Sequence, residues 1–317
     1  MSAPTPARWS TAISLLRLDG ADTRRFLHGQ SSQAIEPGQP GECLATCLIS
    51  ATARMRALAL VCLDATGAEL LVLAGDGAAV HQALDRVLFP ADRVRLGTPQ
   101  PATLVRWLGD LQPEPEAATE LLRPGVDLGA GRDQAVLLQR DGDKLPTWLA
   151  ALPELSDEQV ERLRLRQGFP ATPAELNDNT NPFELGLADW VSLNKGCYVG
   201  QETLAKLATY DGVKQQLRHW RANSATDPDG RCHPGALLTT ATGERAGVIT
   251  SMLAGTEGVE GLALVRRSAL MEPELLAGAG ASDTAAVDGS STALRLQINT
   301  PAGFTAPPVG TGRAQTV

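Results

Sequence analysis

The sequence lacks any apolar run long enough to cross a membrane. Its best apolar stretch, ALALVCL from Ala57, has the length of a buried strand, whereas a spanning helix needs about 20 such residues. The first residues, MSAPTPARWSTAIS, also lack the apolar core of a secretory signal. Because they contain Arg, Ser and Thr but no acid before Asp19, an organelle transit segment is still compatible with them. We nevertheless expect the protein in the cytoplasm.

The sequence has fewer basic than acidic residues. The 317 residues include 28 Lys and Arg against 36 Asp and Glu, so the formal net charge is −8. This balance argues against a general nucleic-acid-binding protein, which would carry a basic surface. A local basic patch remains compatible with it. The apolar share of 43% is that of an ordinary globular protein with a substantial core.

Cysteine and histidine are too few and too scattered for a metal centre or a disulfide framework. Five cysteines are an odd number, and no two form a CxxC pair. Cys43 and Cys47 are four residues apart, but no second pair completes a zinc site, and the four histidines are dispersed. We therefore predict no resident metal. We also expect four of the cysteines to be buried, unreactive thiols: Cys43, Cys47, Cys62 and Cys232.

The first part of the chain mixes strand and helix patterns, which predicts an α+β unit. A helix expected at 156–170 begins with Ser156 as N-cap and Gln159 in a capping box, and ends at Gly168. The Pro- and Glu-rich segment 113–125 predicts a loop or a subdomain boundary. Strands are predicted at 13–20, 43–50, 56–64 and 68–75, with a short helix at 21–32 and an amphipathic helix at 77–90.

From Lys214 the pattern changes to short strands separated by Gly and Asp turns. LRHWRA, GALLTT, RAGVITSML, GLALVRR and ALRLQI are regularly spaced, which is typical of a small β-barrel or sandwich. Residues 276–292 are nearly all Ala, Gly, Ser, Thr and Asp and predict a flexible loop before the last strand. The Pro- and Gly-rich segment after Pro301 predicts a loose tail.

KGCYVGQE at residues 195–202 is the most particular segment of the chain. Gly196 and Gly200 would let the backbone turn tightly and approach another part of the protein closely. The following residues 201–210, QETLAKLATY, have the pattern of a helix. A cysteine between these glycines would therefore lie close to a helix N-terminus.

This position has two interpretations for Cys197. The helix dipole and the charge of Lys195 would both favour a thiolate. Tyr198 could cover the thiol or stack on a flat ligand. From the residues alone, a structural loop with a buried cysteine is still the better supported interpretation.

The same segment resembles the K-G-C-Y-x-G-Q-E signature of the YgfZ-type folate-binding proteins, which support the assembly or repair of iron–sulfur enzymes. Every fixed position of the signature is present. RLDGADTRRFLHGQSS resembles the family's N-terminal L-x-G-x-D…F-L-Q-G-Q segment, with His28 and Ser31 as variants. RLRLRQGFP, AGVITSM and GLALVRR resemble three further segments, so the resemblance covers most of residues 11–270.

That family is similar to the T-protein of glycine cleavage, an aminomethyltransferase that uses tetrahydrofolate. The resemblance implies an α+β, three-lobed fold around a central folate cleft, with two interleaved α+β lobes and a C-terminal β-barrel. The implied limits are 1–213 for the folate-binding domain, with lobes of 1–45 plus 125–213 and of 46–124, then 214–300 for the barrel and 301–317 for the tail.

The resemblance also implies which residues contact a tetrahydrofolate. NPFELGL places Glu184 where a similar glutamate of T-proteins contacts the pterin ring, and a carboxylate can accept two hydrogen bonds from such a ring. An acid at a helix start is the alternative. Glu175 is a weaker candidate, and an exposed loop acid is its default interpretation. The signature implies a reactive thiol at Cys197 beside Lys195 and Tyr198, with folate-side residues at Gly196, Gly200, Gln201 and Glu202.

Other charged and aromatic residues can be interpreted as functional or as merely structural. A basic cluster after the signature could attract the anionic tail of a folate, although a solvated face is the default expectation: Lys206, Lys214, Arg218 and Arg221. Arg54 and Arg56 resemble a basic turn of the family or are simply exposed. Trp190 and Trp220 could line the cleft, but packing is the better explanation.

Three functions are compatible with these residues. The leading hypothesis is a tetrahydrofolate-binding accessory protein for iron–sulfur enzymes, in which Cys197 is a reactive thiol or a transient cluster ligand. No stable cluster is expected, because a full set of thiolates is absent. The alternative is a folate-dependent aminomethyltransferase of the glycine-cleavage type, and the third is a folate-binding scaffold in which Cys197 has no role. We expect iron–sulfur client or assembly proteins as partners, no nucleic acid, no membrane and a monomer.

Overall fold

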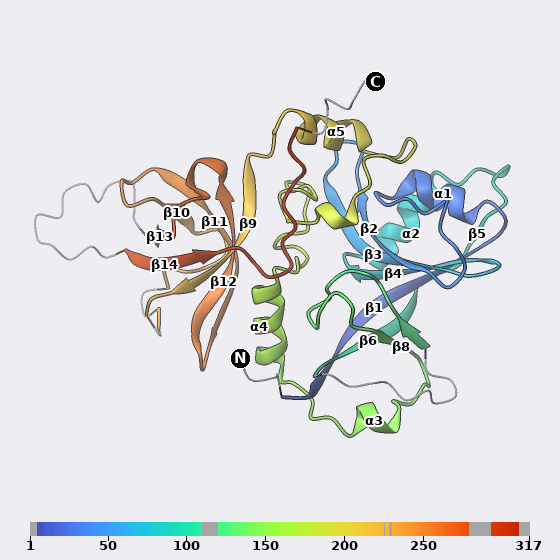
Figure 1. Cartoon of the computed structure of the whole chain (residues 1–317), viewed down its shortest axis with the longest axis horizontal. Coiled ribbons are helices and arrows are strands. Elements are labelled where there is room, and N and C mark those ends of the chain that lie inside the picture. The colour runs from blue at the N-terminus through green and yellow to red at the C-terminus, as the bar shows by residue number, and fades with distance from the viewer. Residues whose placement is uncertain (1–4, 110–119, 225, 228–229, 279–292, 311–317) are drawn as a thin grey trace, which may run out of the picture. The chain divides into compact units, whose positions relative to one another are not determined.

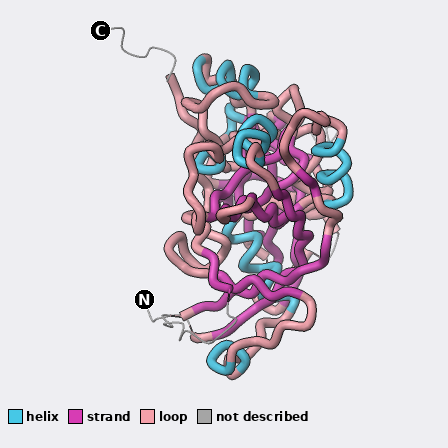
Figure 2. Tube along the Cα trace, turned by 90° about the vertical axis from the view of Figure 1, so that its right-hand side faces the viewer, coloured by secondary structure: helices cyan, strands magenta, loops and turns pink. Residues whose placement is uncertain are grey.

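The computed structural model describes residues 5–109, 120–224, 226–227, 230–278 and 293–310, and the chain divides into two compact units. Long strands and short helices make up the regular structure (Figure 1 and Figure 2). Among the described residues, no helix has the length and apolar character of a membrane span. The first unit comprises Met1–Asp157, Ala171–Asn179 and Asp189–Ala205, and the second comprises Glu158–Pro170, Thr180–Ala188 and Lys206–Val317.

An antiparallel sheet of eight strands is the frame of the first unit. The strand order is β2-β3-β4-β1-β6-β8-β7, and β5 also pairs with β1. The bounds are β1 (Ala7–Asp19), β2 (Cys43–Ile49), β3 (Met55–Leu63), β4 (Gly67–Ala74), β5 (Arg95–Leu96), β6 (Gln100–Leu108), β7 (Glu120–Leu122) and β8 (Val136–Arg140). The four strands predicted in this part are confirmed. β7 lies where a loop is expected, and residues 113–119 of that expected loop or boundary lie outside the described residues.

Apolar patterning explains these strands and the helices that contact them. β3 is buried at nearly every position, as expected for a strand inside a sheet with both faces covered. Helix α1 (Thr23–Gln30) contacts β4, and α2 (Gly77–Asp85) contacts β1. The Asp76 side chain caps α2 by accepting the backbone N–H of Ala78 at 2.9 Å. A third helix, α3 (Thr147–Ala150), carries Trp148, whose ring meets that of Trp107 edge-on.

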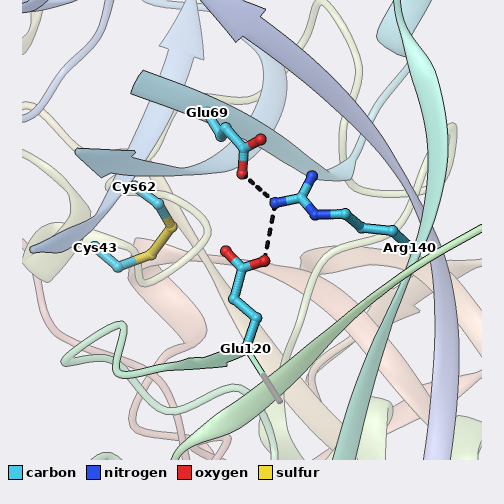
Figure 3. Close-up of a disulfide and its surroundings, with 5 residues drawn as sticks. All are labelled: Cys43, Cys62, Glu69, Glu120 and Arg140. Carbon is cyan, nitrogen blue, oxygen red and sulfur yellow. Dashed lines mark hydrogen bonds and ion pairs between the residues drawn. A yellow bond between two sulfur atoms is a disulfide. The ribbon is translucent and has the colours of Figure 1, made fainter. Parts of the chain in front are cut away.

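A disulfide joins Cys43 of β2 to Cys62 of β3 (Figure 3). The antiparallel register places the two residues directly opposite each other. The expectation that both are free thiols is therefore wrong, because the pairing follows from strand register, which the number and spacing of cysteines do not give. Cys47 and Cys232 are free and buried, as expected.

Arg140 of β8 lies beside this disulfide and links two acidic residues (Figure 3). Its guanidinium is 2.7 Å from the carboxylate of Glu69 on β4 and 2.9 Å from that of Glu120 on β7. Glu69 lies opposite Cys62 in the pairing of β3 with β4. The contact with Glu69 connects β8 to β4, which are not neighbours in the sheet, whereas β7 pairs directly with β8.

A closed barrel of six antiparallel strands is the frame of the second unit. The strand order is β10-β11-β12-β9-β14-β13, with bounds β9 (Gln215–Ala222), β10 (Leu237–Thr239), β11 (Arg245–Gly255), β12 (Gly258–Arg266), β13 (Glu274–Ala277) and β14 (Leu294–Asn299). A short helical turn, η2 (Arg267–Ala269), follows β12. The predicted barrel is confirmed. The end of β13 occupies the start of the expected loop at 276–292, and residues 279–292 lie outside the described residues.

Buried charges join α4 (Asp157–Gln167) to the barrel. Glu260 of β12 is 1% exposed and pairs with Arg162 and, at 3.1 Å, with Arg166. The Nε2 atom of His219 on β9 lies 2.8 Å from the same carboxylate. Because each charge is compensated, the network holds the helix against the barrel without leaving an unpaired buried ion.

Residues 301–310 pack within the second unit instead of forming a loose tail. The backbone N–H of Ala302 donates to the carbonyl of Arg166 at 3.0 Å, and that of Thr305 donates to the carbonyl of Gly186 at 2.8 Å. The expectation of a loose tail is wrong for this stretch, because backbone hydrogen bonds rather than a strand or helix pattern order it. Residues 311–317 lie outside the described residues.

Candidate functional site

The signature residues 195–200 form an irregular loop between the helical turn η1 (Ala188–Trp190) and α5 (Gln201–Thr209). As predicted, the helix begins shortly after Cys197, at Gln201. Cys197 is an exposed free thiol. The interpretation as a buried cysteine that fills a tight turn is therefore wrong, and solvent can reach the sulfur.

The backbone conformation and the surrounding space require a glycine at position 200 but not at position 196. Gly200 has a φ of +81°, in the left-handed region that favours glycine. A methyl group on it would lie 2.6 Å from the carbonyl oxygen of Ser50 and 2.8 Å from Cδ1 of Ile49. A methyl group on Gly196 would meet only Nε2 of His28, at 3.8 Å, apart from its chain neighbours. The predicted close approach is found at Gly200 alone.

Lys195 anchors the loop on the end of α1. Its Nζ donates to the carbonyl oxygens of His28, Ser31 and Gln33, and the last two distances are both 2.7 Å. The last carbonyls of a helix have no partner within it, so the ammonium satisfies that of His28 together with those of two residues just after the helix. Burial lowers the pKa of Lys195 to about 7. The ammonium is directed to the main chain, and its expected effect on the Cys197 thiol stays a prediction.

Tyr198 forms the buried side of the loop. Nζ of Lys195 lies 4.4 Å from the centroid of its ring, which is a cation–π contact. The residue is 8% exposed, and its hydroxyl has no hydrogen-bond partner in the part of the chain that the structure describes. Burial raises the pKa of Tyr198. The packing of Tyr198 therefore fixes the backbone on one side of Cys197, and stacking on a ligand stays a prediction.

Ser32 connects the segments beneath the loop. Its hydroxyl donates to the carbonyl of Trp190 at 2.6 Å and accepts the backbone N–H of Cys47 at 2.8 Å. Its own N–H donates to the carbonyl of Cys47 at 3.0 Å. Trp190 is 5% exposed, in agreement with a packing role. Burial raises the pKa of Cys47, so that thiol stays protonated at neutral pH.

Two further signature candidates lie in the first turn of α5. Nε2 of Gln201 donates to the carbonyl of Lys195 at 3.1 Å and so closes the loop on itself. Glu202 is exposed, in a position that the helix dipole favours for a carboxylate. Contacts of either residue with a folate stay predictions.

Glu175 is fully buried, so its default interpretation as an exposed loop acid is wrong. Its Oε2 accepts a backbone N–H of its own loop at 3.0 Å. Two arginines that follow β2 hold the next residues of this loop. Nη1 of Arg54 donates to the carbonyl of Asn179 at 2.8 Å, and Arg56 pairs with Asp178 at 2.8 Å. Both arginines therefore have a structural task within the first unit.

Glu184 belongs to the second unit and is 7% exposed. Its Oε2 accepts the N–H of Asn181 at 3.1 Å, and its own N–H donates to the side chain of Asn181 at 3.1 Å. The carbonyl of Glu184 accepts the N–H of Leu217 on β9 at 2.7 Å. These residues form a turn, so the alternative of an acid at a helix start is wrong.

Arg218, the residue after Leu217, is 8% exposed, and the expectation of a solvated face is wrong for it. Its Nη2 donates to the side chain of Gln216 at 2.7 Å, and its guanidinium lies 5.0 Å from the ring centroid of Phe304. No carboxylate among the described residues forms an ion pair with it, and burial lowers its pKa. Trp220 packs in the barrel core. The other three basic residues are exposed, as expected: Lys206, Lys214 and Arg221.

In the sequence, His28 stands out only as a variant of the family pattern. The structure places its ring beside the signature loop, because Nε2 is the nearest atom to the open position on Gly196. Nδ1 accepts the backbone N–H of Glu36 at 3.1 Å. Burial, followed by the charge of Lys195, lowers the pKa of His28. The described residues contain no cluster of three or more His, Cys, Asp or Glu side chains suited to a metal ion.

Comparison with known proteins gives two related sequences. A chloroplastic protein of Arabidopsis thaliana, provisionally named a transferase, is 29% identical over 268 residues, which are 77% of this chain and 60% of that protein. The mitochondrial iron–sulfur cluster assembly factor IBA57 of Mus musculus is 33% identical over 142 residues, 44% of this chain and 37% of that protein. The matches therefore span less than two thirds of either relative. No family model matches the sequence.

A solved structure supports the fold. The glycine cleavage system aminomethyltransferase T of Bartonella henselae has a TM-score of 0.72 to this chain, with 96% of this chain and 87% of that protein covered. The sequences are 15% identical, so the likeness concerns the fold. It confirms the α+β T-protein fold that the resemblance implies. The two related sequences therefore support the resemblance to YgfZ- and IBA57-type proteins, and the solved structure shows that the chain has the T-protein fold.

Proposed function

We propose that the protein binds a reduced folate and acts as an accessory protein in the assembly or repair of iron–sulfur enzymes, with Cys197 as its working thiol. The exposure of Cys197 on a loop fixed from both sides is the observation that carries this proposal. Lys195 ties the loop to α1, and Gly200 packs on the turn after β2. A thiol that only filled space would be buried.

The relatives support the iron–sulfur part of the proposal. IBA57 is named as an iron–sulfur cluster assembly factor, and the matched region includes about two fifths of this chain. In this role Cys197 would contact a cluster only transiently, since a stable cluster needs a full set of ligands.

The second unit offers side chains that fit a folate. Glu184 is a buried carboxylate, and its Oε2 accepts the N–H of Asn181. The pterin edge carries N–H groups that such a carboxylate would accept. Arg218 adds a buried guanidinium without a carboxylate partner among the described residues, which suits an anionic or carbonyl group of the ligand. We propose Glu184 for the pterin, with Glu175, Gly196, Gly200, Gln201 and Glu202 as further candidates.

A folate-dependent aminomethyltransferase is the second candidate function. The T-protein fold and the provisional name of the Arabidopsis thaliana relative favour it. T-protein chemistry does not need a cysteine, so the two functions differ in their dependence on Cys197.

Complementation separates these functions. A strain that lacks its YgfZ-type protein receives the wild type, Cys197→Ala or Cys232→Ala, and the activities of iron–sulfur enzymes are measured. We expect rescue by the wild type and by Cys232→Ala, which removes a buried thiol, but not by Cys197→Ala. Rescue by Cys197→Ala would remove the thiol from the function. Folate-dependent ammonia release in a coupled glycine-cleavage assay would instead favour the aminomethyltransferase.

We propose that the protein works as a monomer in contact with iron–sulfur client or assembly proteins. Its compartment is proposed to be the cytoplasm or an organelle matrix, since the two relatives are named chloroplastic and mitochondrial. Light scattering of the purified protein tests the oligomeric state, and a fluorescent fusion tests the compartment.

A further inference from the structure

The structural constraints at the two glycines of the signature loop differ. Gly200 has a left-handed backbone and no room for a side chain. Gly196 has neither constraint, because a methyl group there would meet only His28 Nε2, at 3.8 Å, besides its chain neighbours. Gly196 and Cys197 are both exposed. The missing side chain therefore keeps a space open between the imidazole of His28 and the residue that precedes the thiol.

His28 presents an N–H group to this space. Its Nδ1 accepts the backbone N–H of Glu36, so Nδ1 carries no proton and the neutral ring carries its proton on Nε2. The backbone at His28 is fixed, since Lys195 binds its carbonyl oxygen. The ring is therefore held with a donor facing Gly196.

Lys195, the cation of the loop, has no donor left for a ligand. An ammonium has three N–H groups, and Nζ donates to three carbonyl oxygens. Its charge still acts over a short distance, but a directed hydrogen bond to an incoming group must come from elsewhere. His28 is the residue placed to supply it.

We propose that the space over Gly196 receives an anionic group of the reactant that reaches Cys197, and that the Nε2–H of His28 donates a hydrogen bond to it. This inference rests on the proposed function of Cys197. An acceptor bonded to Nε2 would lie about 2.7–3.2 Å from it, where a side chain at position 196 would interfere. His28 is thus a specificity residue for anionic reactants, and Gly196 preserves their access.

Two alkylating reagents test the proposal. Iodoacetate and iodoacetamide both form a bond from the Cys197 sulfur to carbon and release iodide, but only iodoacetate is an anion. The rate of each reaction at Cys197 is measured by mass spectrometry on the folded protein. The same thiolate attacks both reagents, so the ratio of the two rates does not depend on the fraction of thiol that is ionised.

The variants are His28→Leu, His28→Gln and Gly196→Ala. We expect His28→Leu to lower the ratio of iodoacetate to iodoacetamide rates about tenfold, the usual size of the loss of a hydrogen bond to a charged group. His28→Gln keeps an N–H donor and should stay within about twofold of the wild type. Gly196→Ala should also lower the ratio of iodoacetate to iodoacetamide rates, while its unfolding curve should match that of the wild type. This variant therefore tests the proposal even if His28→Leu fails to fold.

The outcomes separate this inference from the proposed function. An unchanged ratio in His28→Leu and in Gly196→Ala, with Cys197 reactive, would overturn the role of His28 and leave the thiol in place. If Cys197 of the wild type reacts no faster than the buried Cys232, the proposed function fails and this inference fails with it.

Discussion

Gly200 meets the carbonyl oxygen of Ser50 so closely that even a methyl group would lie 2.6 Å from it. The turn that carries Ser50 is itself fixed, because the N–H of Ser50 donates to the carbonyl of Arg54 at 2.9 Å and its hydroxyl accepts the N–H of Arg54 at 3.1 Å. The turn therefore has little freedom to move aside. The placement of Cys197 depends on this contact between two parts of the chain that are 150 residues apart.

Gly200→Ala should destabilise the first unit by about 2–4 kcal/mol, from backbone strain at positive φ and from overpacking against the turn. Gly196→Ala is the matched control and should change the free energy of unfolding by less than about 0.5 kcal/mol, since its methyl group has room. Urea unfolding of the three proteins measures both values. Equal losses in the two variants would mean that the loop does not pack on Ser50 as described.

A second prediction concerns the contribution of the buried Glu260 carboxylate to stability. Glu260→Gln would remove the buried carboxylate shared by Arg162 and Arg166, leaving them only the more exposed Glu158 and Glu257, and should cost about 3 kcal/mol. Glu257→Gln removes an acid of the same network whose side chain is 54% exposed, and should cost less than about 1 kcal/mol. Thermal and urea unfolding compare the variants. A small loss in Glu260→Gln would show that α4 does not depend on this ion pair.

The contribution of Glu260 to the free energy of unfolding should decrease as the pH is lowered into the acid range. Burial alone would raise the pKa of Glu260, but hydrogen bonds from Arg166, His219 and Arg162 outweigh it and hold the pKa below the ordinary 4.5. The unfolded chain therefore binds the proton at a higher pH than the folded one. The contribution is complete above pH 4.5 and is lost as the pH falls through the lower folded value. The difference in stability between wild type and Glu260→Gln should narrow in acid, and a constant difference from pH 7 to 3 would contradict this.

Apolar patterning in the sequence predicts four strands of the sheet, the main helices and five strands of the barrel. β2, β3 and β4 are continuous apolar runs, and the barrel strands recur at short, regular intervals. β5, β6, β7, β8 and β13 are not among the strands predicted from the sequence. β5, β7 and β13 have only two to four residues, which carry too little pattern. Residues 301–310 were missed for another reason, since contacts with distant backbone groups hold them and leave no periodic signal.

At the candidate site, too, contacts between residues far apart in the sequence could not be predicted. Exposure of Cys197 on a loop before a helix follows from the signature, but the partners of Lys195 lie more than 160 residues away in the sequence. Burial of Glu175 and Arg218 contradicts the usual exposure of charged residues, and only tertiary packing decides such cases. The disulfide likewise depends on a strand register that cysteine spacing does not encode.

The Cys43–Cys62 disulfide should stabilise the edge of the sheet, where β2 is the outermost strand. It joins residues 19 apart, and closing a loop of that size contributes about 3 kcal/mol. Mass spectrometry without reductant should find the two peptides joined, and dithiothreitol should lower the urea midpoint. A double variant, Cys43→Ala with Cys62→Ala, should show no effect of reductant. A wild type that responds no more than this variant would mean that the bond does not form in solution.

Glu184→Gln should weaken the binding of a reduced folate while leaving the fold intact. The amide oxygen of Gln can still accept the N–H of Asn181, so the turn is preserved, but the charge that would pair with the pterin edge is lost. The loss of one charged hydrogen-bond partner corresponds to about 1.5–3 kcal/mol of binding free energy. Glu244→Gln removes the same charge from an exposed turn of the same unit and should bind as the wild type does. Calorimetric titration with tetrahydrofolate under anaerobic conditions compares the three proteins, and equal affinities would exclude Glu184 from the folate site.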